Sequence, residues 1–122
     1  NAARINADRL RAIAIEAAEQ SERLTVPVLH PARKLEDVLA CWPADRTLYA
    51  ALERDAAPAL PRPMSRHDAG PAALLVGPEG GFGPRDRAIL ARAGCIAPVS
   101  LGPRILRAET AAIVGLALLQ AG

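Results

Sequence analysis

The sequence predicts an α/β domain, in which helices flank a parallel sheet, because two apolar runs in its last third each lead through a glycine turn into a helix pattern. The first run is residues 74–76, and the second is residues 98–101, before a helix expected to begin near Glu109. Strands that alternate with helices usually form parallel sheets. The two turns are therefore expected beside each other at the carboxyl edge of the sheet, where open α/β sheets bind ligands.

The other elements follow from periodicity and from proline. Asn6 or Asp8 is a suitable N-cap for the first helix, and Pro27 favours an edge strand because it lacks an amide hydrogen. Pro43 ends the second helix. These elements are helices at residues 1–23 and 31–41 and strands at residues 25–29 and 46–50.

Glycine and proline define the first turn and the helix after it. Gly80 and Gly81 lack a Cβ, so they can adopt positive φ and let backbone amides approach a ligand. Pro84 suits the first turn of a helix and Gly94 its end, which predicts a helix at residues 84–93. Upstream, residues 55–71 contain four prolines and no apolar period, so they predict a long surface loop, either a lid or a linker.

Length and composition limit the function only broadly. The 122 residues correspond to a single domain, and a net charge of +2 permits nucleic-acid binding without requiring it. Cys41 and Cys95 form no metal or disulfide motif and are expected to be buried. The two unpaired cysteines favour a cytoplasmic location. The longest apolar run, residues 111–119, is too short to span a bilayer, so a soluble protein is expected.

That apolar run also predicts association. A helix without polar side chains on any face must be covered on all sides, and one sheet covers only one side. We therefore expect a homodimer through the C-terminal helix.

Several chemistries are excluded by missing motifs. The first turn lacks the Gly-Lys-Ser/Thr of a phosphate loop and the third glycine of a dinucleotide fingerprint. Glu79 would repel a phosphate, which favours a neutral or cationic ligand. The serines and the two histidines, His30 and His67, form neither a nucleophile motif nor a metal site.

Three blocks together resemble one family. They are EAAEQSERLTVP at residues 16–27, LVGPEGGF at residues 75–82 and SLGPRILRAETA at residues 100–111. In this order they resemble the RsmE family, which are 16S ribosomal RNA uridine-N3 methyltransferases of the SPOUT class. The resemblance implies a SPOUT-type parallel sheet with a C-terminal trefoil knot, S-adenosylmethionine as the cofactor, and small-subunit ribosomal RNA as the partner.

The resemblance also implies roles for single residues. Apolar side chains and freed backbone groups around both turns would hold the cofactor, namely Leu75, Gly77, Glu79, Gly80, Gly81, Leu101, Gly102, Ile105, Leu106, Thr110 and Ala111. A guanidinium would stabilise charge that develops on the uracil oxygens, and a carboxylate would orient it or accept the proton. The catalytic candidates are Arg107, then Arg104, with Glu109 and Glu19; the substrate-binding candidates are Gln20, Ser21 and Arg23. Glu109 also suits a helix start.

The sequence departs from the family pattern in two respects. Members carry an N-terminal PUA-like RNA-binding domain and then a Lys-rich strand and helix, so this chain is expected to be a shortened piece of such a protein. Glu22 stands where the family commonly has glycine. A non-catalytic dimerisation or RNA-binding module of the same fold is therefore the alternative function, and a SPOUT enzyme acting on transfer RNA is disfavoured by the third block.

Overall fold

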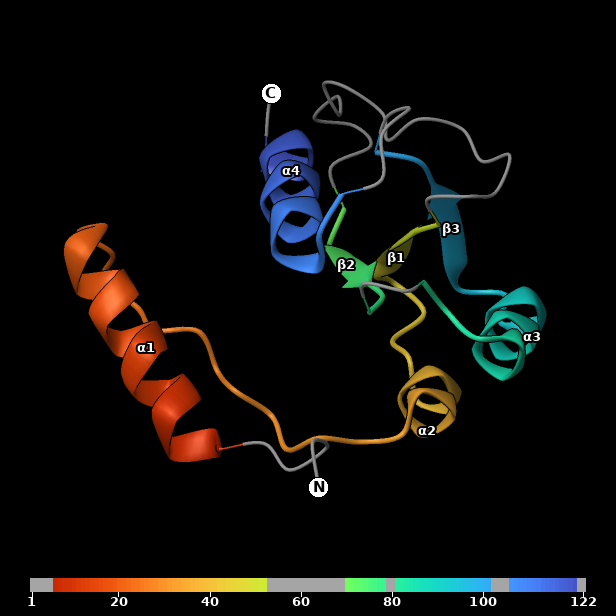
Figure 1. Ribbon diagram of the computed structural model, residues 1–122, viewed down its shortest axis with the longest axis horizontal. Helices are drawn as coiled ribbons and strands as arrows, with labels where there is room; N and C mark the ends of the chain where they lie inside the picture. The colour runs from red at the N-terminus through yellow and green to blue at the C-terminus, as the bar shows by residue number, and fades with distance from the viewer. Residues whose placement is uncertain (1–5, 53–69, 79–80, 102–105, 121–122) are drawn as a thin grey trace. The chain divides into compact units, whose positions relative to one another are not determined.

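The computed structural model describes residues 6–52, 70–78, 81–101 and 106–120 (Figure 1). The chain forms two compact units, Asn1–Lys34 and Leu35–Gly122, and each is described by itself. The expectation of one domain stays a prediction. The loop predicted at residues 55–71 lies almost wholly outside the described residues.

The first unit is built on helix α1, Ala7–Gln20. Asn6 caps it, because its side-chain Oδ1 accepts a hydrogen bond of 3.0 Å from the backbone amide of Arg9. Of the two N-cap candidates, the structure therefore selects Asn6 over Asp8. Within α1 only Ala18 is buried, so this unit has almost no core of its own.

A left-handed turn ends α1. Ser21 is the C-cap, and Glu22 follows it with a φ of 56°. The amide of Glu22 donates to the carbonyl of Glu19 at 3.1 Å, and the amide of Arg23 donates to the carbonyl of Ala18 at 2.9 Å. This pair of hydrogen bonds is the Schellman motif, in which the residue at positive φ is usually glycine.

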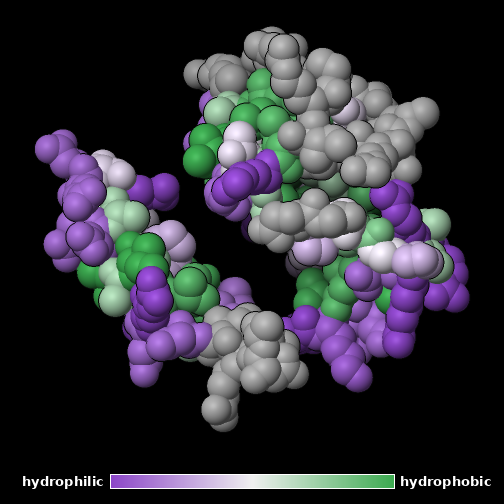
Figure 2. All heavy atoms as spheres, viewed as in Figure 1, coloured by the Kyte–Doolittle hydropathy of each residue, from purple (hydrophilic) through white to green (hydrophobic). Residues whose placement is uncertain are grey.

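The strand predicted at residues 25–29 is wrong, because this segment forms no strand. Pro27 cannot donate to a ladder, and no other strand is described in the first unit that could pair with it. The side chains of Val26, Val28 and Leu29 are exposed instead. Together with apolar residues of α1 they give this unit a partly apolar surface (Figure 2).

The second unit contains a parallel sheet, as predicted, and three strands of it lie in the described residues. Its strands are β1 at Thr47–Ala51, β2 at Ala72–Val76 and β3 at Ile96–Val99, and their order is β2-β1-β3. Strand β3 begins two residues before the range predicted for it. The two glycine turns share an edge but are not adjacent, because β1 lies between the strands that lead into them.

The described part of this unit contains three helices, namely α2 at Leu35–Ala40, α3 at Pro84–Arg92 and α4 at Ala108–Gln120. Helix α3 begins at Pro84, as predicted, and Gly83 is its N-cap; α4 begins one residue before Glu109. Helix α2 is shorter than predicted at its N-terminal end. Residues 31–34 fall in the other compact unit and are not helical.

One face of the sheet lies under α3. Successive strand residues point to opposite faces, so Leu48 and Ala50 share a face with Ile96 and Pro98, their partners on β3. Ile96 and Pro98 line a cavity together with residues of α3, including the buried Leu90. Leu48 and Ala50 are buried, so this face of the sheet forms part of the hydrophobic core of the unit.

The opposite face lies under α4. Leu74 of β2 and its partner Tyr49 of β1 point to this face. A Cβ added to Gly115 of α4 would lie 2.5 Å from a terminal methyl of Leu74. A side chain at position 115 would therefore force Leu74 to move, because the helix approaches the strand closely here, and the sheet lies between α3 and α4 (Figure 1).

Two further expectations can be compared with the structure. Cys41 is exposed, so its predicted burial is wrong: it follows the short helix α2 instead of entering the core, whereas Cys95 is half-buried.

On α4, Ile113 is 69% exposed and Leu116 is 48% exposed. Among the helices in the described part of the chain, none has the length and apolarity needed to cross a membrane.

Candidate functional site

The candidate site lies at the carboxyl edge of the sheet, where all three parallel strands end. The strands end at Ala51, Val76 and Val99, and two of them lead into the glycine turns. Because β1 lies between β2 and β3, the ends of the two strands that lead into these turns are about two strand spacings apart, roughly 10 Å.

The first turn has a backbone that only glycine accommodates without strain. Gly81 has a φ of 81°, as predicted, and its amide donates to the carbonyl of Pro78 at 2.8 Å. A Cβ added to Gly77 would lie 2.9 Å from the ring of Phe82, so the ring packs directly over this glycine. Glu79 and Gly80 lie outside the described residues.

Arg87 of α3 connects the helix to this turn. Its Nε donates to the carbonyl of Phe82 at 3.1 Å, and its backbone amide donates to the carbonyl of Gly83 at 2.9 Å. The residue is half-buried. Sequence reasoning did not single out Arg87; the available signal was a basic residue within the first turns of a helix that opens directly from a glycine loop.

The second turn places apolar side chains and polar groups at the start of α4. Leu101 and Leu106 are half-buried, and the side chain of Arg107 is exposed. The carbonyl of Arg107 accepts a hydrogen bond of 2.8 Å from the amide of Ala111, which is only 1% exposed. Glu109 and Thr110 are exposed in the first turn of α4; Gly102, Arg104 and Ile105 lie outside the described residues.

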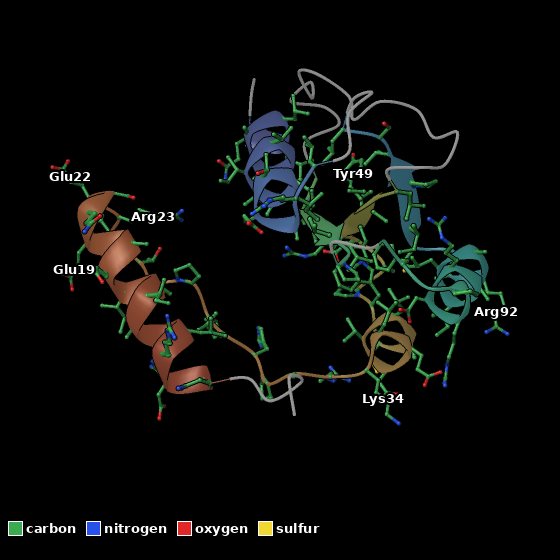
Figure 3. The ribbon with its side chains drawn as sticks, in the orientation of Figure 1. Glu19, Glu22, Arg23, Lys34, Tyr49 and Arg92 are labelled. Atoms are coloured by element: carbon green, nitrogen blue, oxygen red, sulfur yellow. The ribbon has the colours of Figure 1, made fainter. Side chains whose placement is uncertain are left out.

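The substrate-binding candidates lie in the first unit. Gln20 ends α1, Ser21 is its C-cap, and Arg23 follows the left-handed turn. All three are exposed, as is Glu19, and Figure 3 shows Glu19, Glu22 and Arg23 extending from the end of the helix in different directions. The structure therefore groups the described cofactor candidates in the second unit and these polar candidates in the first.

A cavity of about 240 Å³ lies close to the first turn, between α3 and the sheet. Leu52, which directly follows β1, lines it together with the side chain of Arg87 and residues of β3. Its walls are mostly apolar, and among the described residues that line it only Arg87 is charged. Within the described ranges, no group of three or more side chains is arranged to hold a metal ion.

Comparisons with known proteins agree with the sequence blocks. A family model described as "RNA methyltransferase domain" matches residues 1–120. A ribosomal RNA small subunit methyltransferase E from Rickettsia conorii is 39% identical over 113 residues, which are 93% of this chain and 46% of the relative. The protein of the same name from Mycobacterium tuberculosis is 37% identical over 116 residues, which are 88% of this chain and 42% of the relative.

Solved structures give the same result. The ribosomal RNA small subunit methyltransferase E from Neisseria gonorrhoeae, bound to S-adenosyl methionine, matches with a TM-score of 0.73 and 33% identity over 94% of this chain and 48% of that one. A putative methyltransferase from Legionella pneumophila, in complex with the cofactor SAM, matches with a TM-score of 0.70 and 30% identity. The match covers 96% of this chain and 49% of that one. The chain thus spans just under half the length of these relatives. Because the family model covers almost the whole sequence, the chain belongs to the RNA methyltransferase domain family, and its predicted resemblance to the RsmE proteins is confirmed.

Proposed function

We propose that the chain is the cofactor-binding part of an S-adenosylmethionine-dependent methyltransferase that methylates N3 of a uridine in 16S ribosomal RNA. One observation carries the proposal: both turns that bear RsmE-like blocks leave parallel strands at the same carboxyl edge and enter helices. This edge is the usual ligand site of an open α/β sheet. The names and ligands of the relatives support the choice of reaction.

The described residues fit S-adenosylmethionine. The left-handed backbone at Gly81 turns the chain away from its strand, and Leu101 and Leu106 offer half-buried apolar surface for an adenine ring. Small-molecule sites of this kind are mostly apolar, with a few polar groups that fix orientation. When bound, the cofactor supplies a methyl group activated by a sulfonium. Glu79 in the first turn suits that positive charge better than it would suit a phosphate.

Arg107 is the first candidate for the chemical step. It directly precedes α4, its backbone is tied into the helix through Ala111, and its side chain is exposed and available to an RNA base. Removal of the N3 proton places negative charge on the uracil oxygens, which a guanidinium would stabilise. Glu109 lies two residues further on and is exposed, so it is the candidate to orient Arg107 or accept the proton; Arg104 is the second arginine candidate.

The end of α1 is proposed to bind the RNA substrate. Gln20, Ser21 and Arg23 are exposed and polar, and the Schellman turn holds the backbone that carries them. Arg23 can contact a phosphate, while the amide and hydroxyl groups can bind a base edge. Glu19 in the same turn remains a candidate for the proton acceptor.

A homodimer through α4 and a cytoplasmic location are also proposed. Ile113 and Leu116 lie exposed on α4 in the single chain, and burying them would remove apolar surface from water. Light scattering at micromolar concentration tests the dimer, and a monomer at that concentration would exclude it.

Two measurements test the proposed function. Calorimetric titration with S-adenosylmethionine should show binding by this chain. In the full-length protein, transfer of a tritiated methyl group to the intact small subunit should fall about a hundredfold in kcat for Arg107→Ala, the usual cost of losing one group that stabilises transition-state charge.

Arg92→Ala is the matched control, because Arg92 is also an exposed arginine and lies in the last turn of α3, at the opposite end of this helix from the first glycine turn (Figure 3). Its activity should equal that of the unaltered protein. Unchanged activity in Arg107→Ala removes Arg107 from the mechanism. Cofactor binding without any turnover favours the alternative, a non-catalytic dimerisation or RNA-binding module.

A further inference from the structure

We propose that Arg87 is a positioning residue that holds residues 81–83, the described end of the first glycine turn, in the form that binds the cofactor. The inference rests on the proposed function for the identity of the ligand, whereas the contacts of Arg87 stand without it. No block of the RsmE-like pattern includes this residue, since it lies on α3 after LVGPEGGF has ended.

The interactions described for residues 77–78 and 81–83 of the turn include one from a charged side chain, that of Arg87. The left-handed backbone of Gly81 is closed by its amide hydrogen bond to Pro78. The ring of Phe82 packs over Gly77. The carbonyl of Phe82 accepts the hydrogen bond from Nε of Arg87 at 3.1 Å. This last contact ties the turn to α3 and so sets the direction in which the backbone leaves Gly81.

The arginine is suited to this role by its burial and its shape. It is half-buried and lines the 240 Å³ cavity, so its hydrocarbon stem packs while its head group reaches the turn. A charge-assisted hydrogen bond is stronger than a neutral one, and water competes less with it at a half-buried site. Arg85 on the same helix differs, because its side chain is 81% exposed and pairs with Glu36 at 3.2 Å.

The expected change in affinity follows from the fraction of molecules in which the turn is competent to bind. The apparent dissociation constant of a ligand rises in proportion as the binding-competent state becomes rarer. If loss of the Nε donor leaves the turn competent in about a tenth of molecules, the dissociation constant for S-adenosylmethionine rises about tenfold. The KM for the cofactor should rise by the same factor with kcat unchanged, because the residue acts before chemistry and does not touch the reacting atoms.

The informative variant is Arg87→Met, which keeps an apolar stem against the cavity but removes the hydrogen-bond donor. Arg87→Lys retains a donor and should recover part of the loss. Arg85→Ala serves as the control for removing a positive charge from α3. Each variant is measured by titration with S-adenosylmethionine, and by hydrogen exchange of the Gly81 and Ala50 amides without any ligand.

We expect Arg87→Met to raise the dissociation constant about tenfold and to remove almost all protection of the Gly81 amide from exchange, because the turn would then be open in about nine tenths of molecules, with Ala50 in the central strand unchanged. A Met variant that matches the unaltered protein in both measurements overturns the inference. Equal acceleration at Gly81 and Ala50 also overturns it, because this indicates general destabilisation. If the unaltered chain does not bind the cofactor, the proposed function fails, and Gly81 exchange alone decides the role of Arg87.

Discussion

Replacement of Glu22 by glycine should stabilise the end of α1. Glu22 has a φ of 56° in the Schellman motif, a conformation that costs a residue with a Cβ about 1–2 kcal/mol. Glycine avoids this cost but loses about 0.4–1 kcal/mol through the greater freedom of the unfolded chain. The net gain is therefore about 0.5–1 kcal/mol.

The assay is hydrogen exchange at the amide of Arg23, which closes the motif by donating to the carbonyl of Ala18 at 2.9 Å. Because every 1.4 kcal/mol corresponds to a factor of ten, exchange should slow about two- to fivefold. Glu22→Ala provides the comparison. It also removes a carboxylate that is unfavourable near a helix C-terminus, but it keeps the Cβ.

The difference between the glycine and alanine variants therefore measures the backbone term alone. Equal exchange rates in Glu22→Gly and Glu22→Ala would refute the reasoning, because they would leave only an effect of charge. Ser21→Gly adds a second control. Ser21 has a φ of −93°, so glycine relieves no strain there and should speed exchange at Arg23.

Three further predictions concern packing. Gly115→Ala should destabilise the chain by about 1 kcal/mol, since overpacking against Leu74 outweighs the gain in helix propensity, and the thermal midpoint should fall by about 5 °C. Gly77→Ala should weaken cofactor binding by displacing the ring of Phe82, and Phe82→Leu in the same chain should restore part of the affinity, as titration of the unaltered protein and of these two variants would test. Ile113→Lys should convert a dimer into a monomer in light scattering, because it places a charge on the proposed interface.

The elements near the glycine turns were predicted well because their signals are local. Pro84 and Gly83 define the start of α3 through their own backbone preferences, and Gly81 has the positive φ expected of it. Such features depend on one or two residues and little on what packs around them. The start of α4 near Glu109 was found for the same reason.

The errors arose where a structure depends on distant partners. Residues 25–29 have the composition of a strand, but a strand exists only if another pairs with it, and periodicity does not reveal its partner. The sequence does not reveal the strand order β2-β1-β3 either. It predicted that the two turns are adjacent, whereas β1 lies between the strands that lead into them. Glu22 is an intermediate case. The departure from glycine was visible in the sequence, but its left-handed backbone became apparent only in the structure.

The order of the sheet has a consequence for how the chain folds. Every pairing in it closes a long loop: Thr47 to Ala72 spans 25 residues (72 − 47), and Leu48 to Ile96 spans 48 (96 − 48). Doubling a loop costs about 0.6 kcal/mol of closure entropy, or roughly a threefold lower chance of contact. Chain entropy thus favours docking of β2 on β1 before β3 arrives. The edge that carries both glycine turns is complete only at the last of these steps, so a partly folded chain would gain no stability from the ligand.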